Sequence, residues 1–236
     1  MTRTAIWKSI AIGLTADIAE GRYTTGTRLP TEAALAGKYG VNRHTVRRAL
    51  SEMAAQGLVH ARRGSGVFVT SKPTEYAIGK RVRFHQNVAA GGQTPAKQIL
   101  SLNTRAADTR EAEALALHPG DPVHVYDGLS LADEQPIAVF QSVFPANRFA
   151  GLLDALSESQ SVTKALMQCG VADYTRVSTQ ITAKQANATQ ALHLRIAEGS
   201  PILRTVGINA AEDGSPVEYG RSWFAGDRVT LTIGDG

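Results

Sequence analysis

Three apolar runs with helical spacing, separated by glycines, dominate the first 57 residues of the sequence. The first run covers residues 4–20, and Gly21 is placed to end it as a C-terminal cap. A loop follows over residues 21–30, because two glycines and a proline lie in this stretch. We expect the second helix to begin at Thr31, whose hydroxyl can accept a hydrogen bond from a free backbone N–H group, and to end before Gly40. The pattern therefore predicts short helices joined by tight turns.

The third run begins after Asn42, a second capping residue, and ends before Gly57. Its apolar stripe predicts the buried side of a helix and consists of Val46, Ala49, Leu50 and Met53. Two helices joined by the tight KYGVN turn are typical of the helix-turn-helix. The outward side of the third helix carries polar and basic residues, which are Arg43, His44, Thr45, Arg47 and Arg48. Because arginine can donate two hydrogen bonds to O6 and N7 of guanine, this side fits a helix that reads the DNA major groove.

A short hairpin is expected after the third helix, with strands at Leu58–Ala61 and Val67–Thr70 around the turn RRGSG. A basic hairpin at this place is typical of the wing of a winged helix-turn-helix, which contacts the DNA backbone or minor groove. Outside the third helix, the residues expected to meet DNA are Thr31 and the turn residues Arg62, Arg63, Gly64, Ser65 and Gly66.

The distribution of charge agrees with a polyanion binder in the first third of the chain. Residues 1–72 hold 11 lysines and arginines against 4 aspartates and glutamates, a formal charge of +7. Residues 73–236 hold 14 lysines and arginines against 17 aspartates and glutamates, a formal charge of −3. A single cysteine, Cys169, excludes an internal disulfide framework, and neither a signal peptide nor a membrane-spanning apolar run is recognisable. We therefore expect a cytoplasmic protein that binds DNA through its N-terminal part.

The run LPTEAALAGKYGVNRHTVRRALSEMAAQGLVHARRGSGVFV resembles the DNA-binding domain of the GntR superfamily of bacterial repressors. The preceding pattern of Ile18, Gly21, Tyr23, Gly26, Leu29 and Pro30 extends the resemblance over residues 5–70. It implies DNA contacts through Arg43, Thr45 and Arg47 and wing contacts through Gly64 and Gly66. The family usually has an arginine directly after the glutamate of the second helix, where this sequence has Ala33. Either one DNA contact is missing here or another residue supplies it.

Behind the first domain (1–70), residues 71–80 mix proline, glycine and polar residues and are expected to be a linker. The second domain (81–236) alternates expected helices and strands. The helices are expected at 108–117, 147–156, 161–169 and 186–194. The strands are expected at 96–104, 122–132, 136–144, 173–184, 201–211, 216–224 and 228–233. The segments LALHPGDPVHV and LHLRIAEGSPILR echo one another, which favours an internally repeated antiparallel α/β domain.

This second part resembles the effector-binding (UTRA) domain of the HutC branch of GntR regulators, which has a chorismate-lyase-like fold. The resemblance rests on a D-x-x-E-A-x-x-L helix and on PVEYGRSWFAGDR near the end. Within the branch, YAIGKRVRFHQNVAAGG resembles the PhnF-type regulators of phosphonate uptake and breakdown. The expected fold class is therefore α+β, a winged helix-turn-helix joined to a UTRA domain. The function implied is a repressor that binds a palindromic operator as a homodimer and is released by a small anionic effector.

An anion site is expected around Arg81 and Arg83, which would share one face of a strand and could clamp a phosphate or phosphonate. Ser161 opens a helix and could bond an anion through its hydroxyl. The effector-binding residues expected in full are Arg81, Arg83, Phe84, Ser161, Thr163, Glu218, Tyr219 and Arg221. Other roles stay open for three of them: an interdomain salt bridge for Arg81, a helix cap for Ser161 and a surface position for Arg221.

The positions at which amino-sugar-phosphate sensors of this branch carry arginines and a glutamate hold Gly128, Ser130 and Phe140. Thr163 stands where those sensors have a tyrosine. These differences count against an amino-sugar phosphate and predict a smaller, less polar pocket. Glu218 could bind an amine, as aminoethylphosphonate would offer.

No catalytic arrangement is recognisable, so we expect no enzyme, no cofactor and no metal. The six histidines show no metal-ligand spacing, and no nucleophile elbow, Walker loop or dinucleotide fingerprint occurs. Three alternatives stay open: an enzyme with the lyase-like fold, a DNA-binding adaptor without a small ligand, and a regulator that senses a sugar phosphate or amino acid derivative.

Overall fold

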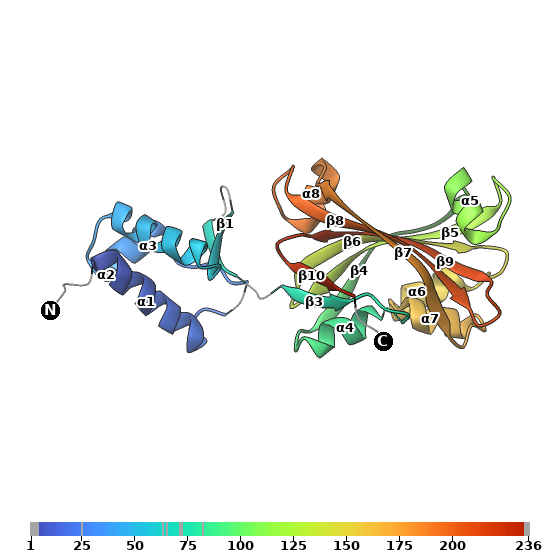
Figure 1. Cartoon of the computed structure of the whole chain (residues 1–236), viewed down its shortest axis with the longest axis horizontal. Helices are drawn as coiled ribbons and strands as arrows, with labels where there is room; N and C mark the ends of the chain where they lie inside the picture. Colours follow the sequence, from blue (N-terminus) through green and yellow to red (C-terminus); the bar gives the residue numbers. More distant parts are fainter. Residues whose placement is uncertain are drawn as a thin grey trace. The chain divides into compact units, whose positions relative to one another are not determined.

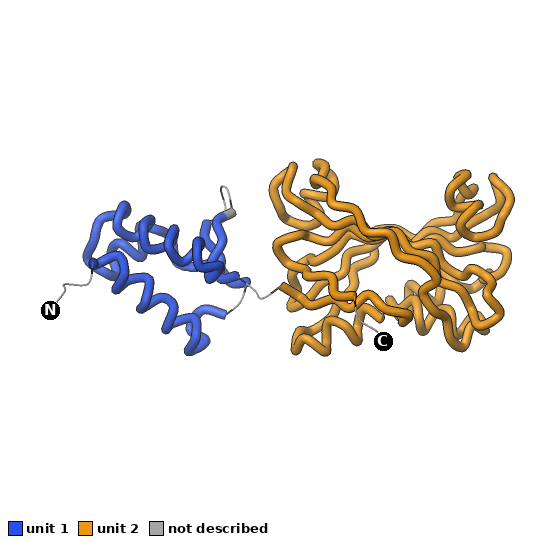
Figure 2. The backbone as a smooth tube through the Cα atoms, viewed as in Figure 1, with its two compact units in different colours: residues 1–72 blue, residues 73–236 orange. Residues whose placement is uncertain are grey.

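The computed structural model shown in Figure 1 describes residues 5–24, 26–62, 64, 66–70, 73–81 and 83–233. The chain forms two compact units, unit 1 (residues 1–72) and unit 2 (residues 73–236), coloured separately in Figure 2. In the described residues no helix is long and apolar enough to cross a membrane.

Unit 1 contains three helices and a hairpin: α1 (Ile6–Ala19), α2 (Glu32–Tyr39), α3 (Arg43–Ala55), β1 (Val59–Arg62) and β2 (Gly66–Val69). Both expected N-caps are confirmed. Thr31 accepts a hydrogen bond from the backbone N–H of Ala34, and Asn42 accepts one from that of Thr45. Gly40 ends α2 in the left-handed conformation with φ 63°, which favours glycine. The local capping signals thus set the bounds of both helices.

The core of unit 1 is formed by the apolar stripe predicted for α3. Val46, Ala49, Leu50 and Met53 are all buried and pack with residues of α1, α2 and the hairpin. Burial of these side chains, and not helix propensity, is the main stabilising contribution for helices this short. The arrangement leaves the opposite side of α3 exposed.

Unit 2 is built around a six-stranded antiparallel sheet with the order β4-β5-β6-β9-β8-β7. Its strands are β4 (Pro95–Ala106), β5 (Pro122–Ala132), β6 (Gln135–Pro145), β7 (Tyr174–Gln185), β8 (Pro201–Ala211) and β9 (Pro216–Ala225). The predicted internal repeat is visible in this order, because β4-α5-β5-β6 and β7-α8-β8-β9 follow the same path and meet at the β6–β9 pair. Helices α5 (Thr109–Leu115) and α8 (Ala188–Leu194) each begin with a reciprocal capping box.

The two faces of the sheet are covered differently (Figure 1). Helices α5 and α8 pack at the two ends of one face, against Tyr219 and Trp223 among others. The other face is covered by α6 (Leu152–Ser159), α7 (Val162–Gln168), α4 (Phe84–Ala90) and a small second sheet. We call this the cavity face, because the cavity described below lies on it.

The structure corrects the expected linker at residues 71–80. Residues 74–77 form strand β3 (Thr74–Ala77), which pairs in parallel with β10 (Val229–Thr232). Thr74 and Tyr76 are buried, and the ring of Tyr76 lies 5.2 Å from that of Phe224. A four-residue strand whose partner lies more than 150 positions away in sequence gives little local signal, which is why composition alone indicated a linker.

Candidate functional site

The outward side of α3 presents the polar residues predicted for DNA contact. Arg43, His44, Arg47 and Arg48 are exposed, and Thr45 is partly buried. The hydroxyl of Thr45 lies 2.9 Å from Asn42 Oδ1 and takes part in the N-cap. Thr31 likewise caps α2. The exposed arginines and histidine therefore form the face of α3 that is available to a partner.

Arg47 is held in place by Glu32 of α2. Its Nε and Nη2 atoms donate to the two carboxylate oxygens of Glu32 at 3.0 Å and 2.7 Å. This hydrogen-bonded pair lowers the pKa of Glu32, and the charges of Arg43 and His44 lower it further. Glu32 is thus an acidic group within a basic face, a role that the sequence pattern did not single out.

Arg48 points to a different partner. Its guanidinium carbon lies 4.7 Å from the ring centroid of Trp7 on α1, a cation–π contact. Arg47 and Arg48, adjacent in sequence, therefore have different surroundings: Arg47 is paired with an acid, and Arg48 is stacked on an indole.

The tip of the wing is described only in part. Arg63, Ser65 and the side chain of Arg62 lie outside the described residues. Gly64 and Gly66 both have positive φ, 74° and 107°. A Cβ at Gly66 would lie 2.7 Å from Arg28 Nε, so a larger residue would meet both backbone strain and the Arg28 side chain.

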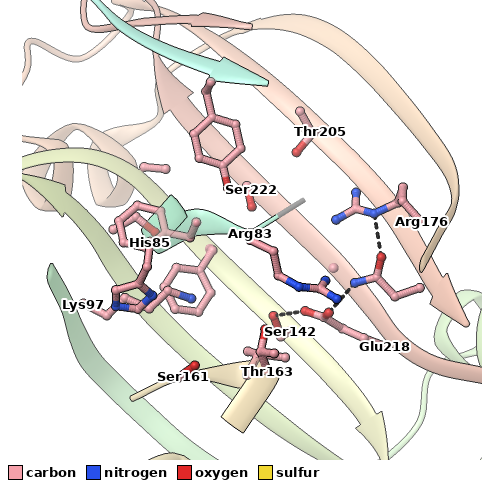
Figure 3. Close-up of a pocket in the computed structure, with 18 of the residues that line it drawn as sticks. Arg83, His85, Lys97, Ser142, Ser161, Thr163, Arg176, Thr205, Glu218 and Ser222 are labelled. Carbon is pink, nitrogen blue, oxygen red and sulfur yellow. Dashed lines mark hydrogen bonds between the residues drawn. The ribbon is translucent and has the colours of Figure 1, made fainter. Parts of the chain in front are cut away.

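A cavity of about 110 Å³ lies on the cavity face of unit 2 (Figure 3). Five of the predicted effector-binding residues line it: Arg83, Phe84, Ser161, Thr163 and Glu218. Ser161 caps α7 by accepting a hydrogen bond from the backbone N–H of Lys164, and the hydroxyls of Thr163 and Tyr174 are hydrogen-bonded at 2.9 Å. In the described residues, no group of three or more histidine, cysteine or acidic side chains could hold a metal ion.

The structure corrects the placement of Tyr219 and Arg221, which lie on the other face of the sheet. Tyr219 packs into the core under α5, and Arg221 donates to the buried Glu111 of α5 at 2.7 Å. Side chains alternate between the faces of a strand, so the cavity receives Glu218, Gly220, Ser222 and Phe224 of β9. Tyr219, Arg221 and Trp223 between them lie on the other face. Arg221 is therefore a structural ion-pair residue.

The expected clamp of Arg81 and Arg83 on one strand is also corrected. Arg83 is the N-cap of α4, and Arg81 lies in a bend and does not line the cavity. Both guanidinium groups instead converge on Asp173: Arg81 forms an ion pair with it, and Arg83 Nη2 donates to Oδ1 at 3.0 Å. Hydrogen bonding to Arg81 is the main reason that the pKa of Asp173 is lowered. Arg81 thus pairs within unit 2.

One end of the cavity carries a hydrogen-bonded chain of side chains on β6, β7, β8 and β9. The buried carboxylate of Glu218 accepts from Ser142 Oγ and from Asn209 Nδ2, each at 2.6 Å. Asn209 Oδ1 in turn accepts from Arg176 Nε at 2.7 Å. A Cβ at Gly207 would overlap the Arg176 guanidinium, so this glycine provides the space in which Arg176 lies. Only Glu218 of this chain was predicted from the sequence.

The other end of the cavity carries Lys97 of β4, a residue that no pattern in the sequence singled out. In Figure 3, Lys97 and His85 lie together, and Arg176 lies at the opposite end. Three aromatic rings surround Lys97 Nζ, with centroids at 4.3 Å for Phe140, 5.4 Å for Phe84 and 5.7 Å for Tyr126. Burial lowers the pKa of Lys97 to about 8, against the opposing effect of the Glu218 charge.

Gly128 explains how Phe140 reaches Lys97. A Cβ at Gly128 would lie 2.6 Å from the Phe140 ring, so the ring occupies the space that any other side chain at position 128 would need. Gly128 therefore makes room for the Phe140 ring in the cavity lining.

Comparison with known proteins identifies both units. Residues 8–69 match the model of the bacterial regulatory proteins of the gntR family, and residues 90–230 match the UTRA domain. The chain belongs to the GntR family. Its UTRA domain makes it a transcriptional regulator of the HutC type.

Several proteins resemble this GntR regulator over nearly its whole length. It is 38% identical over 230 residues to the "Uncharacterized HTH-type transcriptional regulator RB1450" of Rhizobium meliloti (strain 1021), with 97% of this chain and 94% of that protein covered. It is 30% identical over 212 residues to the "Probable transcriptional regulator PhnF" of Escherichia coli (strain K12), with coverages of 89% and 88%. The crystal structure of PhnF from Mycobacterium smegmatis shares the fold, with a TM-score of 0.69, 23% identity and coverages of 96% and 99%.

The site of this GntR regulator thus combines a basic α3 face with a cavity lined by more cations than acids. Of the groups that line the described cavity, Arg83, Lys97 and Arg176 are cationic and Glu218 is anionic. Such a cavity favours an anionic ligand.

Proposed function

We propose that this regulator is a repressor whose operator binding is released when a small anion of the phosphonate or phosphate class occupies the cavity. The observation that carries the proposal is the excess of cationic groups over Glu218 in the described cavity lining. The similarity to a protein named PhnF supports the phosphonate class.

On the DNA side, the regulator would act as a cytoplasmic homodimer on a palindromic operator, with one α3 in the major groove of each half-site. Arg43, His44 and Arg47 would contact bases and phosphates, and the wing residues would contact the backbone. Edge strand β7 supports self-association, because among the described strands it pairs with β8 alone and it exposes Val177 and Ile181. A sedimentation experiment that finds monomers at micromolar concentration, with and without DNA, would contradict the homodimer.

Ligand binding would act by changing the free-energy cost of placing both DNA-binding units on their half-sites. A coupling free energy of about 1–3 kcal/mol is typical and corresponds to a several-fold to hundredfold change in operator affinity. No catalytic step is needed for such a role.

The direct test is a gel-shift titration on the DNA upstream of the protein's own gene, with and without inorganic phosphate, methylphosphonate or 2-aminoethylphosphonate. Specific binding that one of these anions weakens supports the proposal. Specific binding that no small anion changes would overturn the effector class, and absence of any specific binding would overturn the operator.

A second candidate effector is an amine-bearing metabolite that is not a phosphonate, such as an amino acid derivative. It is favoured by Glu218, whose carboxylate is buried at the end of the cavity remote from Lys97. In the same gel-shift titration, this candidate predicts that the amine-bearing compound releases the operator and that methylphosphonate does not.

A further inference from the structure

The cations that line the cavity differ in whether the protein already supplies hydrogen-bond acceptors to them. Arg83 donates to Asp173 and to the carbonyl oxygen of Tyr174 at 3.0 Å and 3.1 Å. Arg176 donates to Asn209 and Thr179 at 2.7 Å and 3.3 Å. For Lys97, the described part of the chain provides neither a hydrogen-bond acceptor nor an acidic partner within ion-pair distance, and only aromatic rings surround its ammonium group. Lys97 is therefore the lining cation for which the described residues supply no hydrogen-bond acceptor.

An ammonium group in such surroundings is in an unfavourable state. The ammonium group has lost part of its hydration. Its attraction to the ring faces replaces only a fraction of the lost hydration free energy. The charged and titratable groups near it are His85 of α4, Tyr126 of β5 and Glu218 of β9, and the charge of Lys164 on α7 acts on His85. Glu218 is already bonded to Ser142 and Asn209, so it does not form an ion pair with Lys97. An oxyanion placed against Lys97 would supply the missing partner in a region of low dielectric, where the attraction is strong.

The rings beside Lys97 add a second requirement for the ligand. Phe84 and Phe140 form apolar walls next to the ammonium group, and both line the cavity. A carbon atom bonded to the oxyanion would contact these rings, whereas a fully hydrated inorganic ion would have to give up water to reach the same place.

We propose that Lys97 is the residue that anchors the effector, and that the effector is a short organic oxyanion whose charged group lies on Lys97 and whose carbon part lies along Phe84 and Phe140. The inference rests on the proposed function, because it assumes that the cavity is the effector site. It replaces the pair Arg81 and Arg83, which are engaged with Asp173, as the principal anion contact.

The test is isothermal titration calorimetry of the full chain at low salt and pH 7.5, with methylphosphonate and inorganic phosphate as probes. We expect methylphosphonate to bind more tightly than phosphate, and Lys97→Met to weaken its binding at least tenfold. Lys164→Met is the matched control, since it removes the same charge from an exposed position near the cavity and outside its lining. The affinity of the Lys164→Met variant for methylphosphonate should stay within twofold of the native value.

Competing outcomes separate the two proposals. Methylphosphonate binding that survives Lys97→Met but is lost in Arg83→Met would overturn Lys97 as the anchor and leave the anionic effector intact. Failure of the native protein to bind either probe or 2-aminoethylphosphonate would overturn the effector class as well.

A second measurement does not depend on the folding of a variant. The native protein is acetylated at low reagent concentration, and the modification of each lysine is followed by mass spectrometry. Methylphosphonate should slow the modification of Lys97 and leave that of Lys164 unchanged. Equal rates at Lys97 with and without the probe would contradict the proposal.

Discussion

Arg47 on α3 donates two hydrogen bonds to the carboxylate of Glu32 on α2, from Nε at 3.0 Å and from Nη2 at 2.7 Å. The Arg47 side chain is nevertheless 60% exposed, so the pair lies on the surface that is expected to face DNA. Bidentate pairing fixes the plane of the guanidinium group, while an Nη1 atom remains to donate elsewhere. Glu32 therefore orients a candidate base-reading arginine and at the same time reduces the local positive charge.

Replacement of Glu32 by Gln should increase binding to DNA of any sequence and reduce the preference for the operator. The carboxylate charge repels phosphates, and its loss leaves Arg47 less constrained. We expect the ratio of operator to scrambled-DNA affinity to fall roughly fivefold or more, measured by fluorescence anisotropy at two salt concentrations. Glu52→Gln on α3 is the control, because Glu52 accepts a hydrogen bond from Gln56 and not from a basic residue of the DNA-binding face. An unchanged ratio in E32Q would show that the pair has no part in specificity.

Replacement of Arg47 by Ala should relax base discrimination more than replacement of Arg48 does. A bidentate arginine contact to guanine typically accounts for roughly a fivefold to hundredfold preference over another base. Arg48 is stacked on Trp7, so R48A should weaken binding to all sequences by a similar factor. Competition assays against operators with single base changes distinguish the two patterns. An R47A protein with native base preferences would contradict the assignment.

The affinity for methylphosphonate should fall as the pH rises above about 8. In the free protein the pKa of Lys97 is lowered to about 8 by burial, and a bound anion would raise it again. Binding therefore has its full strength below pH 8 and should weaken by up to roughly tenfold per pH unit above it. The pKa of His85 is lowered by burial and by the charge of Lys97, so His85 is neutral in this range. Calorimetry from pH 7.5 to 9.5 measures the effect, and K97R should show a much flatter profile.

The substitution Lys97→Met should stabilise the ligand-free protein at pH 7. A lysine whose folded pKa is lowered costs stability while it is protonated, and this cost disappears between the folded value of about 8 and the unfolded value near 10.5. We expect the free energy of unfolding to rise by about 1–3 kcal/mol at pH 7, with the difference from the native protein shrinking as the pH increases. Urea unfolding at several pH values tests this. A K97M protein that is less stable than the native one at pH 7 would mean that the ammonium group has favourable contacts.

Arg221→Ala should leave effector affinity unchanged but destabilise unit 2. Arg221 and Arg105 both pair with the fully buried carboxylate of Glu111 on the face opposite the cavity. Burial alone would raise the pKa of Glu111, but hydrogen bonds from Arg105 and Asp108 and the charge of Arg221 together lower it. Removing one cation should cost about 1–3 kcal/mol, measured by urea unfolding, with methylphosphonate affinity within twofold of the native value. A strong loss of methylphosphonate affinity in a folded R221A protein would support the prediction from the sequence that Arg221 contacts the effector.

The sequence by itself determined the elements whose signals are local. Thr31, Asn42 and the glycine after α2 set the bounds of two helices through contacts within a few residues, and the apolar stripe of α3 set its buried side. The repeated strand and helix pattern of unit 2 could be predicted for the same reason, because hydrophobic periodicity and helix capping are properties of short segments.

Only the tertiary structure decided which residues face the cavity. Whether Glu218 or its neighbour Tyr219 faces inward depends on which face of β9 the other elements cover, and a shift by one residue exchanges the two faces. The rings around Lys97 belong to Phe84, Tyr126 and Phe140, which lie on three separate elements. Asp173 forms ion pairs with Arg81 and Arg83, which lie about 90 positions away in the sequence. Such contacts have no local signal, since the burial and charge of a side chain are set by residues that only the folded sheet brings together.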